Sequence, residues 1–357
     1  MPHTLCVMPT FKCTAQCREC GTLSTPRDAT WLPMEDMRRA ITEAAAAGYA
    51  EVVFSGGEAT LAGEALFQAM LHARHSGLAV RLVTNSHWAA TAEAAERMLD
   101  DLAAAGVVHL TLSTGDEHAR FVPLEHVLNA ARASLSHGIG SSIVVEASAT
   151  RVMNAESVKT HPQYMAFSEQ FPSAEVEVSD WTWTPLSPYR HGQYAEGATA
   201  DLSNLHARGR CAEVLSTTTL QADGTLSPCC GIAIRVASGL RLGSIREVDV
   251  ASADAAAARN FLLRWLRAEG PERILAWAAA IDPTVQWEGL YAHPCQACMR
   301  VFKDSKIQRV VAERGSEKAS EVEFLETLFV PAAVVGPVLS AEMATAHEAN
   351  EAPEPPT

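Results

Sequence analysis

Three cysteines near the start of the chain have a spacing that could bind a metal. Cys13, Cys17 and Cys20 form a Cys-x3-Cys-x2-Cys pattern directly after a short apolar segment at residues 5–8. Such a loop can offer three thiolates to a four-iron cluster and leave one iron open. Three cysteines this close together would also suit zinc, or could be a chance cluster. The pattern alone leaves the metal undecided.

The spacing resembles the signature of the radical S-adenosylmethionine (SAM) enzymes. In that superfamily three cysteines hold a 4Fe-4S cluster, SAM binds its open iron, and a reducing electron releases a 5′-deoxyadenosyl radical. Residues 54–58, FSGGE, follow the second predicted strand and resemble the family's Gly-Gly-Glu motif. The resemblance implies that Gly56, Gly57 and Glu58 bind SAM, because backbone without side chains lets the SAM amino group approach main-chain oxygens.

Polar residues also follow the third and fourth predicted strands. By the same resemblance, Asn85 and Ser113 contact the ribose and carboxylate of SAM, although each could instead cap the next helix. Asp116 and His118 could act on a substrate as acid or base, or could be exposed loop residues. Glu19 occupies a position that is usually aromatic or apolar in the family and lies near the adenine, so that contact is in doubt here.

A second cysteine set lies in the last third of the chain. Cys211, Cys229, Cys295 and Cys298 would suit zinc as four thiolates. Together with the Asp223-Gly224 turn of a predicted hairpin, their order resembles the twitch domain, a shortened SPASM domain. That resemblance implies an auxiliary 4Fe-4S cluster, ligated by all four cysteines, that transfers electrons.

Two cysteines remain outside these sets. Cys230 adjoins Cys229 and could return a hydrogen atom to a substrate radical, as a free cysteine does in radical SAM epimerases, or it could be a spare buried thiol. Cys6 lies within the first predicted strand and is expected to be a small core residue.

Short β-rich segments recur through the first half of the chain. They lie about thirty residues apart, with helical patterns between them, at residues 5–8, 51–54, 80–84, 107–112, 142–146 and 175–179. This alternation predicts βα units and a parallel sheet. It matches the partial (β/α)6, TIM-like barrel of the resembled superfamily, so we predict an α/β fold with the active site at the C-terminal strand ends.

We predict three regions along the chain. Residues 1–200 form the radical SAM partial barrel. Residues 201–312 form a small twitch-type domain with a β-hairpin and helices, including an alanine-rich helical insert at about 250–285. Residues 313–357 form a C-terminal helix followed by a disordered tail rich in Ala, Pro and Glu. The aromatic stretch around Trp181 and Trp183, between the first two regions, could line a substrate cavity or pack the domain interface.

Composition narrows the function classes. The formal net charge of −14 argues against a nucleic-acid substrate. No segment approaches the roughly 18 apolar residues of a membrane span, and the start has no signal-peptide pattern. We therefore predict a cytoplasmic protein, in which the nine cysteines stay reduced and available for metal or redox chemistry.

Together these features predict a radical SAM enzyme with SAM and two 4Fe-4S clusters as cofactors. It would abstract hydrogen from an unactivated C–H bond and oxidise or crosslink a ribosomally synthesised peptide. A dehydrogenase or epimerase of a small molecule, such as a sugar or aminocyclitol, is the alternative, and a non-catalytic electron-transfer or zinc protein is a distant one. Expected partners are flavodoxin or ferredoxin as electron donor. Because the chain starts at the first barrel strand, a peptide substrate would need either a separate leader-peptide recognition protein or direct docking.

Overall fold

The computed structural model describes residues 4–147, 150–173, 176–190 and 192–328. The chain divides into one compact unit up to Ser316 and a second that begins at Glu317. In the second unit, helix α12 covers Ala319–Leu328. The tail predicted to be disordered, from residue 329 onward, lies outside the described residues.

One sheet of nine strands organises the first unit. Its order is β6-β5-β4-β3-β2-β1-β7-β8-β9, and β1 to β6 pair in parallel. The strands are β1 (Thr4–Val7), β2 (Glu51–Phe54), β3 (Ala79–Thr84), β4 (Val107–Thr114), β5 (Gly140–Ala147), β6 (Glu177–Thr182), β7 (Thr217–Leu220), β8 (Thr225–Ser227) and β9 (Gly243–Ser244). All six predicted strands are present, which confirms the α/β fold with a parallel sheet.

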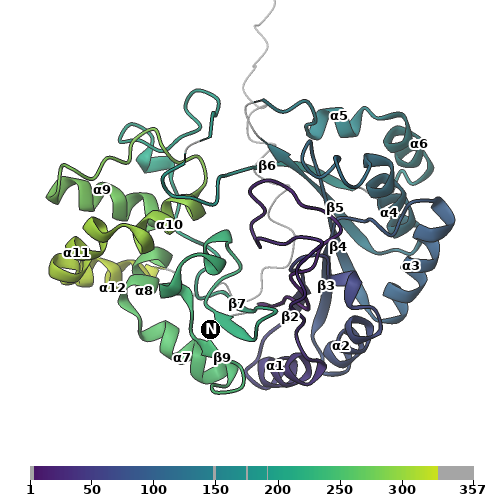
Figure 1. Ribbon diagram of the computed structural model, residues 1–357, viewed down its shortest axis with the longest axis horizontal. Coiled ribbons are helices and arrows are strands. Elements are labelled where there is room, and N and C mark those ends of the chain that lie inside the picture. The colour runs from purple at the N-terminus through teal and green to yellow at the C-terminus, as the bar shows by residue number, and fades with distance from the viewer. Residues whose placement is uncertain (1–3, 148–149, 174–175, 191, 329–357) are drawn as a thin grey trace, which may run out of the picture. The chain divides into compact units, whose positions relative to one another are not determined.

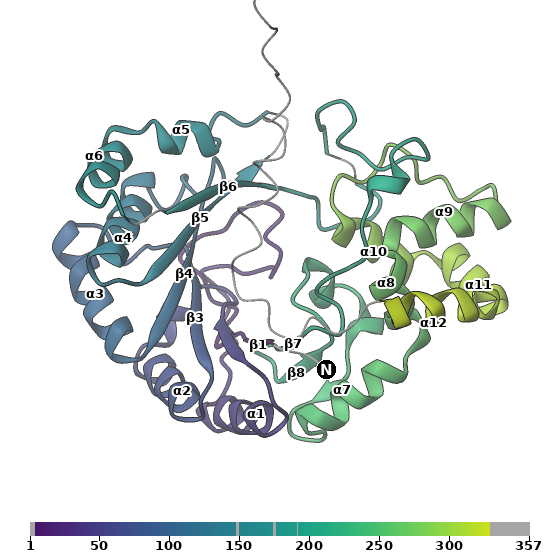
Figure 2. The same ribbon diagram turned by 180° about the vertical axis from the view of Figure 1, so that it is seen from behind.

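Helices between the strands cover the outer side of the sheet (Figures 1 and 2). They are α1 (Met34–Ala46), α2 (Glu64–His75), α3 (Ala92–Ala104), α4 (Leu124–Ser136), α5 (Ala155–Lys159) and α6 (Pro162–Gln170). Pro33 precedes the first helical residue of α1, and Gly48 follows its C-cap with a φ of 83°. These two residues delimit the helix because proline favours a helix start, whereas glycine tolerates the left-handed conformation just past its end.

The core lies between this sheet and the surrounding helices. Leu5, Val7, Val52 and Phe54 of the first two strands are fully buried and belong to one continuous hydrophobic cluster with the inner faces of α1 and α2. Cys6 is 4% exposed, as predicted for a small core residue. The apolar strand residues therefore hold the strand ends, and the loops that follow them, in fixed positions.

The sheet continues directly into the second half of the unit. Strand β7 pairs in parallel with β1, and the predicted hairpin joins β7 to β8, with Gly224 at a φ of 83° in its turn. Tyr49 and Thr218 both donate hydrogen bonds of 2.6 Å to Asp254 of helix α7 (Val250–Arg259). The sheet therefore continues from the barrel strands into the region that holds the second cysteine set. The predicted boundary near residue 200 stays a prediction.

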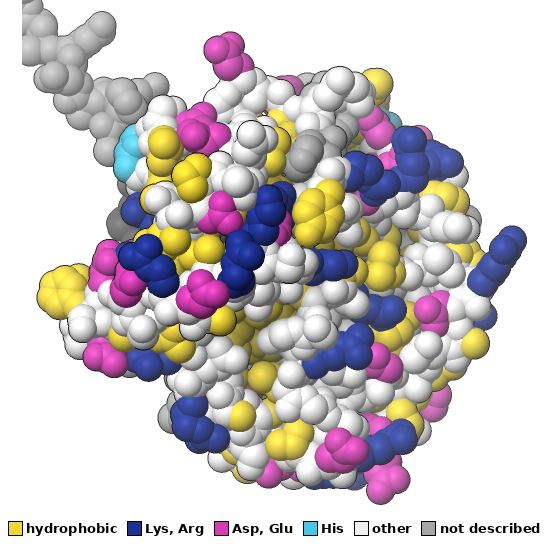
Figure 3. Space-filling model, turned by 60° about the vertical axis from the view of Figure 1, so that its left-hand side comes forward, with side chains coloured by type: hydrophobic (Ala, Val, Ile, Leu, Met, Phe, Trp, Pro, Cys, Tyr) yellow, Lys and Arg dark blue, Asp and Glu magenta, His cyan; other side chains and the backbone are white. Residues whose placement is uncertain are grey.

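Helices dominate the rest of the first unit. The alanine-rich stretch forms α7 (Val250–Arg259), α8 (Phe261–Glu269) and α9 (Pro271–Ile281), which are followed by α10 (Pro294–Lys303) and α11 (Ser305–Arg314). None of the helices among the described residues is long and apolar enough to cross a membrane. On the face seen in Figure 3, basic, acidic and hydrophobic side chains are interspersed.

Candidate active site

The first cysteine set lies in the loop that connects β1 to α1. The loop leaves the C-terminal end of β1 and passes alongside the residues that follow β2. Gly57 N donates to Thr10 O at 2.8 Å, and Glu58 N donates to Lys12 O at the same distance. The end of the second strand therefore holds the backbone immediately before Cys13.

Close backbone contact explains the two glycines of the Gly-Gly-Glu motif. A Cβ atom on Gly57 would lie 2.1 Å from Lys12 O, and one on Gly56 would lie 2.7 Å from Thr10 O. Gly56 also has a φ of 114°, which side chains disfavour. Sequence reasoning assigned these glycines to SAM. The structure adds a second requirement, because any side chain here would displace the cysteine loop.

Glu58 anchors this region from within the protein. Its side chain is fully buried and accepts hydrogen bonds from the Thr84 hydroxyl at 2.9 Å and from Asn85 N at 2.8 Å. The amide of Asn85 in turn donates to Thr14 Oγ1 at 3.0 Å and lies 3.6 Å from Cys13 Sγ. Asn85 therefore reaches the cysteine loop, as expected for a residue of this site, and its contact with SAM stays a prediction.

The three thiols of the loop influence one another. Burial, followed by the charges of neighbouring groups, raises the pKa of Cys13 to about 11 and that of Cys17 to about 12. The neighbouring groups include the other cysteines of the loop, so the three sulfurs share one region. The raised pKa values mean that forming adjacent thiolates costs free energy in the absence of a metal. Binding to a metal cluster would offset that cost. These residues thus fit the ligand set of an iron–sulfur cluster.

Glu19 departs from the family pattern and has its own partners in this structure. Its backbone is left-handed, with a φ of 59°, and its carboxylate accepts a hydrogen bond from Leu186 N at 2.8 Å. The same carboxylate forms an ion pair with Arg190. The residue before the third cysteine therefore ties the loop to the segment that follows β6.

The loop after β4 separates the two predicted acid–base candidates. Asp116 accepts hydrogen bonds from Val152 N and Met153 N, at 2.7 and 2.9 Å, and so holds the segment after β5. His118 lines a cavity, as does Ser113. Of the two candidates, only His118 is among the residues that line this cavity.

Glu146 is a cavity residue that sequence reasoning missed. Its side chain is 6% exposed, and its Oε2 lies 2.6 Å from His118 Nδ1. A Cβ atom on Gly115 would lie 2.0 Å from the Glu146 side chain, so only glycine leaves room for the carboxylate. An acidic residue near the end of the fifth predicted strand was the available signal, because strand ends carry the site in such barrels.

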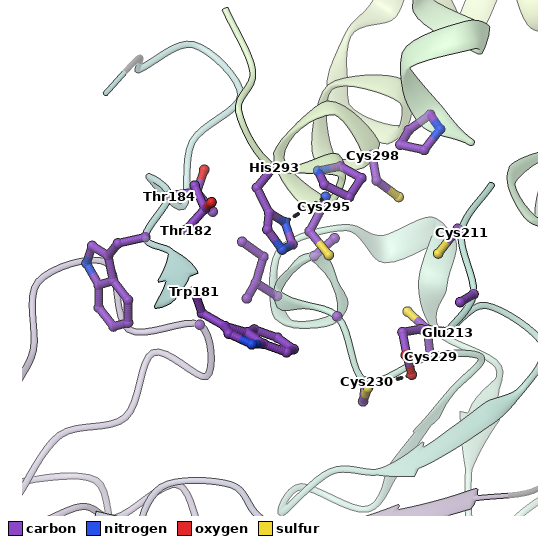
Figure 4. A pocket seen from close by; sticks show the side chains of 18 of the residues that line it. Trp181, Thr182, Thr184, Cys211, Glu213, Cys229, Cys230, His293, Cys295 and Cys298 are labelled. Carbon is purple, nitrogen blue, oxygen red and sulfur yellow. Dashed lines mark hydrogen bonds between the residues drawn. The ribbon is translucent and has the colours of Figure 1, made fainter. Parts of the chain in front are cut away.

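A cavity of about 560 Å³ joins the barrel to the second cysteine set (Figure 4). The barrel side contributes the strand-end residues just described together with Trp181 and Thr182 at the end of β6 and Trp183 directly after it. The opposite side contributes all four cysteines of the second set and apolar residues such as Val214, Ile232 and Leu266. The aromatic stretch around Trp181 and Trp183 thus lines the cavity. The ring of Trp183 packs edge-on against His118 with ring centroids 5.6 Å apart.

Different elements position the four cysteines of the second set. Cys211 N donates to Leu266 O of α8, Cys229 follows the hairpin, and Cys295 and Cys298 lie one turn apart on α10. The His293 side chain caps α10 by accepting a hydrogen bond from Cys295 N at 3.1 Å. In Figure 4 the four sulfur atoms surround one space.

The electrostatics of these thiols agree with that arrangement. Burial raises the pKa of Cys229 and Cys298, and the charges of neighbouring cysteines raise it further. Burial, followed by the charge of Cys211, raises the pKa of Cys295 to about 12. A Cβ atom on Gly231 would lie 3.0 Å from Cys295 Sγ, so glycine allows the close approach of this thiol. Among the described residues, no three His, Cys, Asp or Glu side chains are arranged to hold a single metal ion.

Cys230 points to a different neighbour from Cys229. Its Sγ donates a hydrogen bond of 3.4 Å to Glu213 Oε2, and both side chains line the cavity. Figure 4 shows this pair beside the space that the other four sulfurs surround. Cys230 is therefore available to a molecule in the cavity.

The arrangement of cysteine loop, glycine motif and barrel is matched by a family model. Residues 7–159 match the model of the radical SAM superfamily. This matched part of the chain is similar to the radical SAM superfamily. A curated relative, "Putative peptide biosynthesis protein YydG" of Bacillus subtilis (strain 168), is 28% identical over 119 residues. This match covers 33% of the chain and 37% of the relative, so it spans well under half of that protein.

Solved structures share the fold of this chain over nearly its whole length. The structure described as native anSMEcpe with bound AdoMet and Cp18Cys peptide is 13% identical, with a TM-score of 0.54, over 92% of this chain and all of that one. The same protein with bound AdoMet alone gives a TM-score of 0.53 over 91% of this chain and all of that one. At this identity the likeness concerns the fold.

Proposed function

We propose that this radical SAM protein abstracts a hydrogen atom from a peptide substrate held in the cavity between the two cysteine sets. One observation carries the proposal. Both cysteine sets belong to the same compact unit, and the second set faces the cavity at the C-terminal ends of the barrel strands. When bound, a cluster at Cys13, Cys17 and Cys20 with SAM supplies a 5′-deoxyadenosyl radical, and a cluster at the second set supplies an electron acceptor.

The chain's own residues provide binding and protection. Apolar side chains such as Val144, Val214 and Leu266 line the cavity and would exclude water from a reactive carbon radical. The exposed Trp181 at the end of β6 offers a surface for the residues of a peptide that flank the reacting one. The peptide-biosynthesis description of YydG and the peptide in the anSMEcpe structure support a peptide over a sugar or aminocyclitol.

Oxidation or crosslinking of the peptide is the outcome we favour, because the four cysteines of the second set can ligate an electron-accepting cluster. A second outcome, epimerisation, is favoured by a separate observation. Cys230 lines the same cavity and carries a thiol that can return a hydrogen atom to a substrate radical. Net oxidation removes two hydrogen atoms from the peptide, whereas hydrogen return leaves its composition unchanged.

The test is 5′-deoxyadenosine release by the anaerobically reconstituted, reduced protein with SAM. Peptide and small-molecule fractions of host extract are supplied separately. Stimulation by the peptide fraction supports the proposal, and stimulation only by the small-molecule fraction contradicts it. In D2O, a product with one solvent deuterium that is lost in Cys230→Ala indicates epimerisation, whereas a product lacking two hydrogens indicates oxidation.

A further inference from the structure

The short helical segment after Cys229, the second cysteine of the second set, reaches back to the first cysteine loop. This segment, η3, covers Ile232–Arg235. A Cβ atom on Gly21, the residue after Cys20, would lie only 2.6 Å from Ile232 Cγ2. The chain therefore passes from Cys229 to the immediate surroundings of Cys20 within a few residues.

Arg235, at the end of η3, is partly buried and has one buried guanidinium nitrogen without a hydrogen-bond partner. Its Cζ lies 3.4 Å from the centroid of the Phe11 ring, in the loop just before the first cysteine. Among the described residues, its Nη1 is buried without a hydrogen-bond partner, and no ion pair is formed by this side chain. A guanidinium stays protonated in proteins, so this is a fixed positive charge with a free donor.

The charges that surround Arg235 come from both halves of the unit. Burial lowers its pKa, the carboxylates of Asp223 and Asp28 and the thiolate of Cys20 act in the opposite direction, and the charge of Arg241 acts in the same direction as burial. Asp223 belongs to the hairpin turn, and its side chain and that of Asp28 are at least partly exposed to solvent. The cation therefore lacks a close carboxylate partner while it lies within electrostatic range of the first cysteine loop.

We propose that Arg235 is a positioning residue for the first cluster, whose cation raises the cluster's reduction potential from the Cys20 side. The proposal rests on the proposed function, in that Cys13, Cys17 and Cys20 must hold a cluster. Reduction adds negative charge to a cluster, and a nearby buried cation stabilises the reduced state. The side chain thereby links the electrostatics of the first cysteine loop to a segment that the second set positions.

The test is a potentiometric titration of the full-length, reconstituted protein, followed by electron paramagnetic resonance. The signal that changes on addition of SAM identifies the first cluster. Arg235→Gln is expected to shift its midpoint potential to more negative values, with the reduced fraction at a fixed low potential falling on the order of tenfold. Arg235→Lys, which keeps the charge, is expected to retain most of the potential.

Arg241→Gln is the matched control, because Arg241 is a nearby arginine with an exposed side chain. It should leave the midpoint potential unchanged. Equal midpoint potentials in Arg235→Gln and the wild type, at equal iron and sulfide content, would overturn the role proposed for Arg235. They would leave the proposed function standing. A wild-type protein that binds no iron and sulfide at the first set would instead overturn the proposed function and this inference with it.

If Arg235→Gln fails to fold, Phe11→Leu provides a second test. It removes the aromatic ring against which the guanidinium packs and leaves the charge in place. A midpoint potential that shifts to more negative values in Phe11→Leu, by less than complete loss of the charge would cause, supports the inference. An unchanged midpoint potential in Phe11→Leu contradicts it.

Discussion

The first cysteine set comes from one short loop, whereas the second is assembled from three separate segments. Cys13, Cys17 and Cys20 follow a single strand, and hydrogen bonds from the Gly-Gly-Glu segment hold the backbone before them. Cys211, Cys229 and the α10 pair meet only after a hairpin and helices α8 to α10 have folded. The comparison indicates that local sequence positions the first set and tertiary packing positions the second.

The two sets also differ in what lies next to them. The first set lies beside polar strand ends, with the amide of Asn85 3.6 Å from Cys13 Sγ. The second set lies among apolar side chains and faces the cavity together with Cys230. The polar surroundings of the first set and the apolar surroundings of the second agree with the separate roles proposed for the two sets.

Loss of a ligand from the first set should have the largest effect. Cys17→Ala is expected to abolish 5′-deoxyadenosine formation, because three thiolates are needed to hold the cluster that activates SAM. Chromatography with mass spectrometry of the reduced protein with SAM measures this. Cys6→Ala, which alters a buried thiol outside both sets, is the control and should retain the activity. Residual activity in Cys17→Ala would remove the first set from the mechanism.

Loss of a ligand from the second set should separate SAM cleavage from product formation. Cys295→Ala is expected to lower the iron content by about half and to abolish modified product, while 5′-deoxyadenosine is still released. Iron and sulfide analysis alongside both product assays measures this. If Cys295→Ala stops SAM cleavage as completely as Cys17→Ala does, the two sets do not have separate roles.

A methyl group between the second strand end and the cysteine loop should have an intermediate effect. Gly57→Ala places a Cβ atom 2.1 Å from Lys12 O, and the overpacked backbone is expected to cost about 1–3 kcal/mol in the free energy of unfolding. Denaturant unfolding and SAM binding both report it. Gly209→Ala is the control, since its Cβ would meet nothing within 4 Å. Equal stability of the two variants would contradict the close-packing argument.

Removal of the Asn85 amide should have the smallest effect on stability. Asn85→Ala loses the 3.0 Å hydrogen bond to Thr14 and is expected to cost about 1 kcal/mol in unfolding free energy while weakening SAM binding. Asn129→Ala removes a hydrogen bond of 3.0 Å to Ala89 O, away from the cysteine loop, and should leave SAM binding unchanged. Equal SAM affinity in the two variants would exclude Asn85 from the site.

Strand positions were predictable because their signal is local. Apolar β-rich segments separated by helical patterns gave the six parallel strands within a few residues of their observed ends, and the Asp223-Gly224 turn located the hairpin. The glycines at 56 and 57 were also identified, although the close approach of Thr10 and Lys12 could not be foreseen. That approach depends on which loops the sheet order places side by side.

Several residues of the candidate site could not be identified from sequence patterns. Glu146, Glu213 and His293 line the cavity without belonging to any recognised spacing. Asp116 and His118 looked equivalent in sequence, yet one holds a backbone segment and the other faces the cavity. Two residues on one loop can point in different directions, and the packing around the loop decides which of them faces the cavity.

The amino-acid sequence by itself determined the cysteine loop, the glycine motif and the alternating strands, because each depends on neighbours within a few residues. The tertiary structure alone decided that β7 would join the barrel sheet beside β1, that Glu19 would pair with Arg190, and that Arg235 would lie over Phe11. These contacts link residues far apart in the chain. Their partners are selected by burial and by the geometry of the whole sheet, which no local pattern encodes.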